Sequence, residues 1–180
     1  MDKRQVQIIR DINNKQLVLI NDIVFCGRQN INWENVENYI KQYIGDLTQI
    51  VETQDNIYVG SDFPDEYTGS KDTARLKGTL AKAKANAAQG IPELVKIATN
   101  KRYQENLKDK HIKNAKYGWY RYDSRFALPV FDDKGDIQRY NIFSIVLVVR
   151  HAVDGKMYLY DMIHIKKEAG TPFKQLCHTV

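Results

Sequence analysis

The stretch that most constrains the fold lies in the last third of the chain, where three long β-strand patterns follow one another. They cover Gly118–Phe131, Asp136–His151 and Lys156–Glu168, and they are rich in the Tyr, Phe, Ile and Val residues that strand faces favour. The connections Asp132–Gly135 and Ala152–Lys156 carry the Asp and Gly residues of tight hairpin turns. We therefore predict a three-stranded meander around which the rest of the chain is organised.

The sequence ahead of this meander predicts helices that cover a sheet. A chain of 180 residues fits one domain, residues 1–180, with a short N-terminal arm over residues 1–16 and the long β-meander over 118–168. The expected fold class is α+β, with N-terminal helices packed on a mainly antiparallel sheet that ends in the three-stranded meander. Neither a bilayer-spanning apolar run nor a secretory leader pattern is present, so we expect a cytoplasmic protein.

The sequence predicts neither a metal site nor a cofactor. Asp62, Asp65 and Glu66 lie close together, but they lack the spacing of a calcium-binding loop and fit a polar surface loop over residues 61–70. Cys26 and Cys177 have no metal-ligand spacing either. We expect both to be reduced thiols, and the sequence leaves their pairing open.

One basic stripe is expected on a long helix from Ser70, the predicted N-cap, to Gly90. Lys71, Arg75 and Lys82 form this stripe, and Gly78 falls between them in the helix interior, where it costs about 1 kcal/mol relative to Ala. A glycine at this position allows another backbone to approach the helix closely, and that backbone could belong to a partner or to the protein's own sheet. The polar segment over residues 100–118 that follows is a further candidate helix.

The charge of the chain is unevenly distributed. Residues 1–99 carry 12 Lys and Arg against 13 Asp and Glu, whereas residues 100–180 carry 15 against 9. A basic half that is also rich in aromatic residues suits contact with phosphate or with an acidic protein surface. The alternative is a solvated basic surface without any partner.

Strand alternation places several of these residues on common faces. Arg121 and Arg125 share one face of the first long strand, while Tyr158, Tyr160, His164 and Lys166 share a face of the third. If the two faces coincide, a groove there would bind phosphate through Arg and stack bases on Tyr. The predicted binding residues, with the helix stripe included, are Lys71, Arg75, Lys82, Arg121, Arg125, Tyr158, Tyr160 and Lys166.

A catalytic alternative uses some of the same side chains. His164 or His111 would act as general base in metal-independent RNA cleavage, with Arg125 or Lys166 stabilising the phosphorane. A lone strand histidine is more often structural or exposed than catalytic, and the chain lacks P-loop, HExxH and GxSxG motifs. The sequence therefore leaves open whether the protein is an enzyme.

Three long phrases carry a resemblance to a known group of proteins. GSDFPDEYTGSKDTARLKGTLAKAKANAAQG, KYGWYRYDSRFALP and DGKMYLYDMIHIKKE resemble small proteins and fused modules of phages and mobile elements of gut Firmicutes, similar to domains associated with large phage polyvalent proteins. The resemblance spans residues 21–172. It implies either a counter-defence protein, such as a CRISPR-effector inhibitor, or a toxin-like nuclease of the barnase–EndoU–colicin–RelE type.

We therefore expect a non-enzymatic, anti-CRISPR-like inhibitor that binds nucleic acid or a nucleoprotein defence complex. The alternative is a metal-independent endoribonuclease. A third interpretation is a purely structural accessory module.

Overall fold

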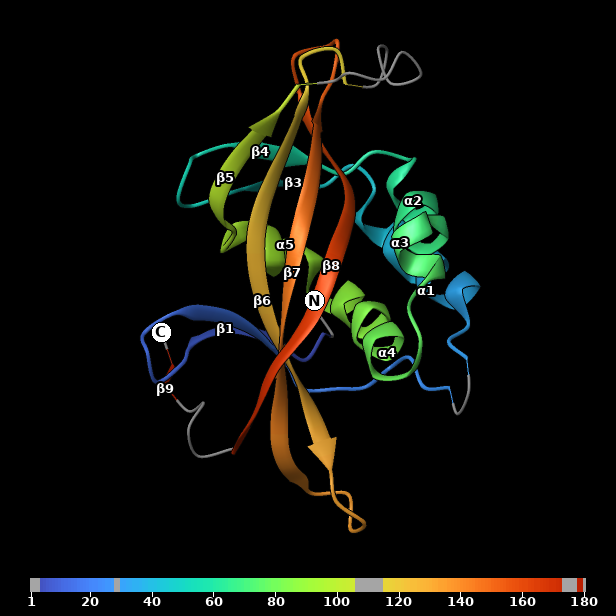
Figure 1. The fold of residues 1–180 in the computed structure, drawn as a ribbon, viewed down its shortest axis with the longest axis vertical. Helices are drawn as coiled ribbons and strands as arrows, with labels where there is room; N and C mark the ends of the chain where they lie inside the picture. The colour runs from blue at the N-terminus through green and yellow to red at the C-terminus, as the bar shows by residue number, and fades with distance from the viewer. Residues whose placement is uncertain (1–3, 28–29, 106–114, 173–177, 180) are drawn as a thin grey trace.

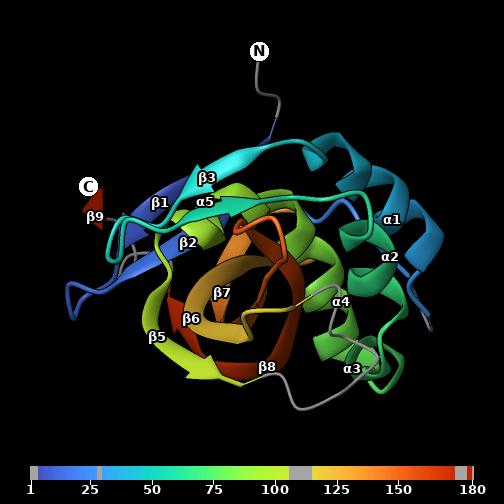
Figure 2. The ribbon, with the colours of Figure 1, turned by 90° about the horizontal axis from the view of Figure 1, so that it is seen from above.

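The computed structural model describes residues 4–27, 30–105, 115–172 and 178–179, and in this part of the chain the α+β class is confirmed. Nine strands form one curled sheet, and most of the helical segments lie together beside it (Figures 1 and 2). The strands are β1 (Val6–Arg10), β2 (Gln16–Ile20), β3 (Leu47–Gln49), β4 (Asn56–Tyr58), β5 (Thr99–Gln104), β6 (Trp119–Phe131), β7 (Ile137–His151), β8 (Met157–Pro172) and β9 (His178–Thr179).

The three long strands follow the predicted boundaries closely. β6 pairs with β7 and β7 pairs with β8, both antiparallel. Gly135 and Gly155 occupy the two turns with φ of 84° and 83°. This left-handed backbone region strains residues with a side chain, which explains why glycine stands at both positions.

The expectation of a mainly antiparallel sheet that ends in the meander is wrong. The strand order is β3-β4-β8-β7-β6-β2-β1-β9, with β5 also paired to β6, so the long strands lie in the middle of the sheet. β2 pairs with β6 and β4 pairs with β8 in parallel, which makes the sheet mixed. These additions satisfy backbone groups that long edge strands would leave unpaired. Within the expected N-terminal arm, residues 6–10 form β1.

The helical segments are shorter and more numerous than predicted. They are α1 (Trp33–Ile40), α2 (Phe63–Gly69), α3 (Lys71–Ala74), α4 (Gly78–Ala87) and α5 (Ile91–Lys96), with 3-10 turns at Lys41–Tyr43 and Ala88–Gly90. Asn32 caps α1, because its side chain accepts a hydrogen bond from the Asn35 backbone N–H.

Three predictions for this part of the chain are corrected. The stretch expected as a polar loop forms α2, because Phe63 and Tyr67 lie one turn apart and are fully buried. The long helix from Ser70 is broken, and Gly78 opens α4 with φ of 58° instead of lying in a helix interior. The first residues of the candidate polar helix over 100–118 belong instead to β5 (Thr99–Gln104).

The main core lies between the sheet and the helices. In α4 the alanines at 83, 85 and 87 are fully buried, and their small side chains let the helix pack closely against neighbouring elements. Asn86 is also buried and anchors the segment before α1, since its amide exchanges hydrogen bonds with the backbone of Phe25. A smaller cluster, which includes Ile9 and Tyr140, forms a second core. None of the described helices has the length and apolar character needed to cross a membrane.

Candidate functional site

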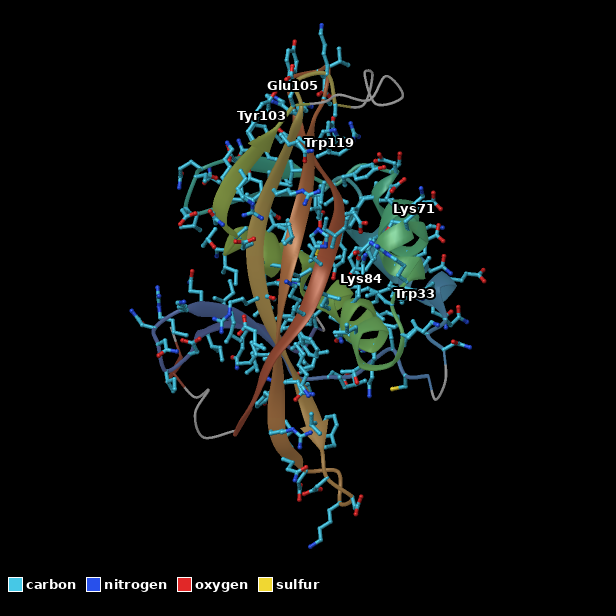
Figure 3. All side chains as sticks on the ribbon, in the orientation of Figure 1. Trp33, Lys71, Lys84, Tyr103, Glu105 and Trp119 are labelled. Atoms are coloured by element: carbon cyan, nitrogen blue, oxygen red, sulfur yellow. The ribbon has the colours of Figure 1, made fainter. Side chains whose placement is uncertain are left out.

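A cavity of about 600 Å³, which we call the sheet cleft, lies between the long strands and the α2–α3 segment. Trp119, Arg121 and Tyr160 line it from the sheet, and Lys71 and Arg75 line it from α3 and the residue after it. Figure 3 shows Trp119 near one end of the sheet and Lys71 on the neighbouring helical segment. A cavity of this size is typical of ligand sites.

The sheet side of the cleft is aromatic. Trp119 and Tyr160 meet edge to face with ring centroids 4.9 Å apart. Trp119 is also the cross-strand partner of Arg150, which in turn pairs with Tyr158. The Arg150 guanidinium lies 4.3 Å from the Tyr158 ring centroid, and Tyr58 packs on Tyr158 at 5.9 Å. Aromatic rings and a cation therefore follow one row across the strands beside the cleft.

The cleft carries charges of both signs. Among the described residues, neither Arg121 nor Lys71 has an ion-pair partner, while Arg75 lies 3.8 Å from Asp72. Glu66 and Glu105 add carboxylates to the lining. The cleft is therefore not a uniformly basic channel, although it offers unneutralised cations at both the sheet and the helical side.

A buried ionic cluster adjoins the cleft. The Lys84 side chain is fully buried, and its Nζ lies 3.1 Å from Asp161 Oδ1 and 3.5 Å from Asp72 Oδ2. The same ammonium lies 4.9 Å from the Tyr67 ring centroid. Burial raises the pKa of Asp161 to about 6, against the opposing effect of the Lys84 charge. Lys84 thus ties α4 to α3 and β8 and fixes the wall of the cleft.

Tyr160 is held in its neutral form. Burial, together with the nearby Glu66 carboxylate, raises the pKa of Tyr160 to about 12. The phenol therefore keeps its proton at physiological pH.

The structure brings together four of the eight predicted binding residues, namely Lys71, Arg75, Arg121 and Tyr160. Tyr158 lies in the neighbouring aromatic row. Sequence reasoning missed Trp119 and Arg150 as site residues. Trp119 had a usable signal, because alternation places it on the face of Arg121. Arg150 had none, because its neighbours depend on strand register.

The other predicted binding residues lie elsewhere. Arg125 and Lys166 are both opposite Ser144, so they share a row, but neither lines the sheet cleft. The Arg125 guanidinium is 3.0 Å from both the Asp11 and the Glu168 carboxylates, which neutralise it. Lys82 is exposed on α4 and lines a different cavity.

The described part of the chain does not hold the candidate general base His164 in a fixed orientation. His164 is exposed, stands at an irregularity of β8 with φ of 54°, and its imidazole has no hydrogen-bond or ion-pair partner among the described residues. His111 lies outside the described residues. A general base normally needs a second group to orient its ring.

No metal-binding group of three or more His, Cys, Asp or Glu residues occurs in the described ranges. Asp62, considered above as a cation ligand, lies 3.5 Å from Arg150 instead. Cys26 is an exposed free thiol, whereas Cys177 lies outside the described residues.

Comparison with protein-family models, with curated proteins and with solved structures gives no match for this chain.

Proposed function

We propose that this protein is a non-enzymatic binding protein whose sheet cleft takes a single-stranded segment of nucleic acid, either free or within a nucleoprotein complex. The observation that carries the proposal is the composition of the cleft lining. The Trp119 and Tyr160 rings contact each other, and they line the same cleft as Arg121 and, on the helical side, Lys71. Stacking of bases on aromatic rings beside cations is the general chemistry of single-strand binding. The phage resemblance suggests a counter-defence role, an anti-CRISPR-like inhibitor acting on a defence complex.

The mixed charge favours a single strand over a duplex. Glu66 and Glu105 would repel a continuous phosphate track, but carboxylates accept hydrogen bonds from the N–H groups on base edges. Bases directed inward and phosphates directed to Lys71 and Arg75 would satisfy both signs. A duplex keeps its base edges paired and presents only its phosphates to a cleft of this kind.

The surroundings of His164 favour binding over RNA cleavage as the proposed function. Its imidazole lacks an orienting partner among the described residues, and Arg125, the expected phosphorane stabiliser, is neutralised by two carboxylates. Cleavage of RNA that persists in EDTA and disappears in His164→Ala would reverse this ranking in favour of the endoribonuclease.

Fluorescence anisotropy with labelled single-stranded RNA, single-stranded DNA and duplex tests the proposal. We expect single strands to bind best. If the three cations of the cleft each contact one phosphate, the slope of log affinity against log salt should be about −2. The double variant Lys71→Gln/Arg121→Gln should weaken binding about tenfold or more, because each charge-assisted hydrogen bond contributes about 1.5–3 kcal/mol. Trp119→Leu should weaken it through lost stacking of about 1–3 kcal/mol.

The matched control is Lys15→Gln/Lys134→Gln, which removes the same charge from two exposed turns. It should bind nearly as the unmodified protein does. Equal weakening by both double variants would show that only net charge matters and would remove the cleft from the proposal. If no strand binds even at low salt, the partner is a protein, and a pull-down from the host with and without nuclease would identify it as such.

A further inference from the structure

A second cavity, which we call the hairpin pocket, has a volume of about 580 Å³ and shares no lining residue with the sheet cleft. Figure 1 shows that the β6–β7 hairpin extends past α4, and residues of both elements line the pocket. Lys82 lines it from α4, Arg139 and Asn141 line it from β7, and Lys167 lines it from β8. The segment that contains Cys26 closes another side.

The charged side chains among the described residues of the hairpin pocket are all cationic. Lys82, Arg139 and Lys167 contribute three positive charges, and none of the described lining residues carries a carboxylate. Among the described residues, none of the three forms an ion pair, whereas Arg125 and Arg102 elsewhere on the sheet each meet a carboxylate. Like charges gathered without a counter-charge repel one another, and an anion placed between them relieves that repulsion. The pocket therefore selects an anionic group.

The rest of the pocket lining is largely apolar. The aliphatic and aromatic side chains of Pro129, Phe131 and Phe143 line it. Phe143 is buried and stacks on Phe126 with ring centroids 5.3 Å apart, whereas Phe131 is 43% exposed. A flat apolar wall beside three cations suits a ligand that joins a planar body to an anion.

Asn141 adds a directional requirement. Its side-chain carbonyl is buried and has no hydrogen-bond partner among the described residues. A buried acceptor without a donor costs about 1–3 kcal/mol, so a ligand that supplies an N–H group there would gain this energy on binding. Nucleobases carry such donors on their edges.

We propose that the hairpin pocket binds a nucleoside phosphate. The phosphate lies among Lys82, Arg139 and Lys167, the base packs against the wall of Phe131 and Phe143, and a base N–H donates to the Asn141 carbonyl. Phosphate is an anion that both Lys and Arg bind well. This site stands on its own residues and does not depend on the function proposed for the sheet cleft.

Isothermal titration calorimetry with the four nucleoside monophosphates, with inorganic phosphate and with unphosphorylated nucleosides tests the proposal. At least one monophosphate should bind about tenfold or more tightly than inorganic phosphate or its own nucleoside. Lys82→Gln/Arg139→Gln should weaken that binding at least tenfold, since two charge-assisted contacts are lost. Lys134→Gln, on the exposed tip of the same hairpin, is the control and should leave it unchanged.

The variant Asn141→Leu distinguishes the contribution of the base to binding from that of the phosphate. It should weaken binding of the monophosphate several-fold without altering the affinity for inorganic phosphate, a difference that a general loss of stability would not produce. Cys26 supplies an independent measurement, because its exposed thiol lines the pocket. In a Cys177→Ser background, the bound nucleotide should slow alkylation of Cys26.

The nucleoside phosphate has two sources, a free nucleotide or the phosphorylated end of a strand. Binding of the free monophosphate supports the first source. Binding of a 5′-phosphorylated oligonucleotide about tenfold or more tighter than its 5′-hydroxyl form, without binding of the monophosphate, supports the second. The proposal is overturned if neither binds, or if Lys82→Gln/Arg139→Gln binds as the unmodified protein does. Lys71→Gln/Arg121→Gln should not change nucleotide binding in the hairpin pocket. A failure of the proposal for this pocket can therefore be distinguished from a failure of the proposal for the sheet cleft.

Discussion

Replacing Lys84 by methionine should destabilise the protein strongly at neutral pH. The Lys84 side chain is fully buried and that of Asp161 is 5% exposed, so the substitution removes a buried ammonium while keeping a similar length. Removing one partner of a buried pair typically costs about 3–5 kcal/mol, because the remaining charge stays buried without compensation. For a chain of this size that loss corresponds to about 6–20 °C in Tm.

The loss should depend on pH in a defined direction. Burial raises the pKa of Asp161 from 3.8 to about 6, so between these values the folded state binds more protons than the unfolded state. Stability from this group is therefore greatest at low pH and falls as the pH rises through 6. Without the Lys84 charge the pKa of Asp161 rises further, and the decrease in the stability of the folded state therefore continues to higher pH. Lys84→Met should then lose little at about pH 4.5 and most at about pH 8.

Urea unfolding of Lys84→Met and of the unmodified protein, at these two pH values, measures the effect. The double variant Lys84→Met/Asp161→Leu is the control, since it removes both charges and should recover much of the stability. A loss below about 1 kcal/mol at the higher pH, or an equal loss at both pH values, would refute a buried, charge-paired Lys84.

Two further substitutions test the roles of other polar contacts. Arg125→Gln should lower the unfolding free energy by about 1–3 kcal/mol in urea titrations, because it breaks the ion pairs with Asp11 and Glu168, yet leave nucleic-acid affinity unchanged; weakened binding would return Arg125 to the site. Asn86→Ala should cost about 3 kcal/mol or more by thermal unfolding, because the backbone of Phe25 and its neighbour loses its hydrogen-bond partners; a loss within about 0.5 kcal/mol would contradict this anchoring role.

The parts of the fold that the sequence predicted are those with a local physical signal. The three long strands combine β-branched and aromatic residues with Asp/Gly turns, so the predicted bounds of β6 and β7 agree closely with the structure, whereas β8 continues past its predicted end at Glu168 to Pro172. The start of α1 carries a local signal as well, because Asn32 is a capping residue followed by an apolar stripe.

The parts that were missed depend on distant contacts. α2 is only seven residues long, and its buried Phe63 and Tyr67 are surrounded by acids that favour a loop assignment. The parallel pairs join short segments to strands far along the chain, for which no local pattern exists. Propensity alone cannot rank such pairings.

The candidate site was only partly predictable for a related reason. Alternation placed Tyr160, His164 and Lys166 on one face of a regular strand, but β8 shifts register between its partners Val148 and Val149 and again near Ser144. Each β-bulge re-aims the side chains beyond it. The residues were chosen from the right strands, whereas their grouping needed the observed register.

The parallel pairing of early strands with late ones has a consequence for how the chain folds. Ile57 of β4 meets Met157 of β8, and Val18 of β2 meets Phe126 of β6, so both pairs require closure of very long loops. Such a contact order predicts slow folding, in the millisecond-to-second range for comparable topologies. During synthesis β2 and β4 emerge together with their neighbours β1 and β3, but the edges that later meet β6 and β8 stay unpaired until those strands leave the ribosome, and unpaired edges of this kind are prone to aggregation.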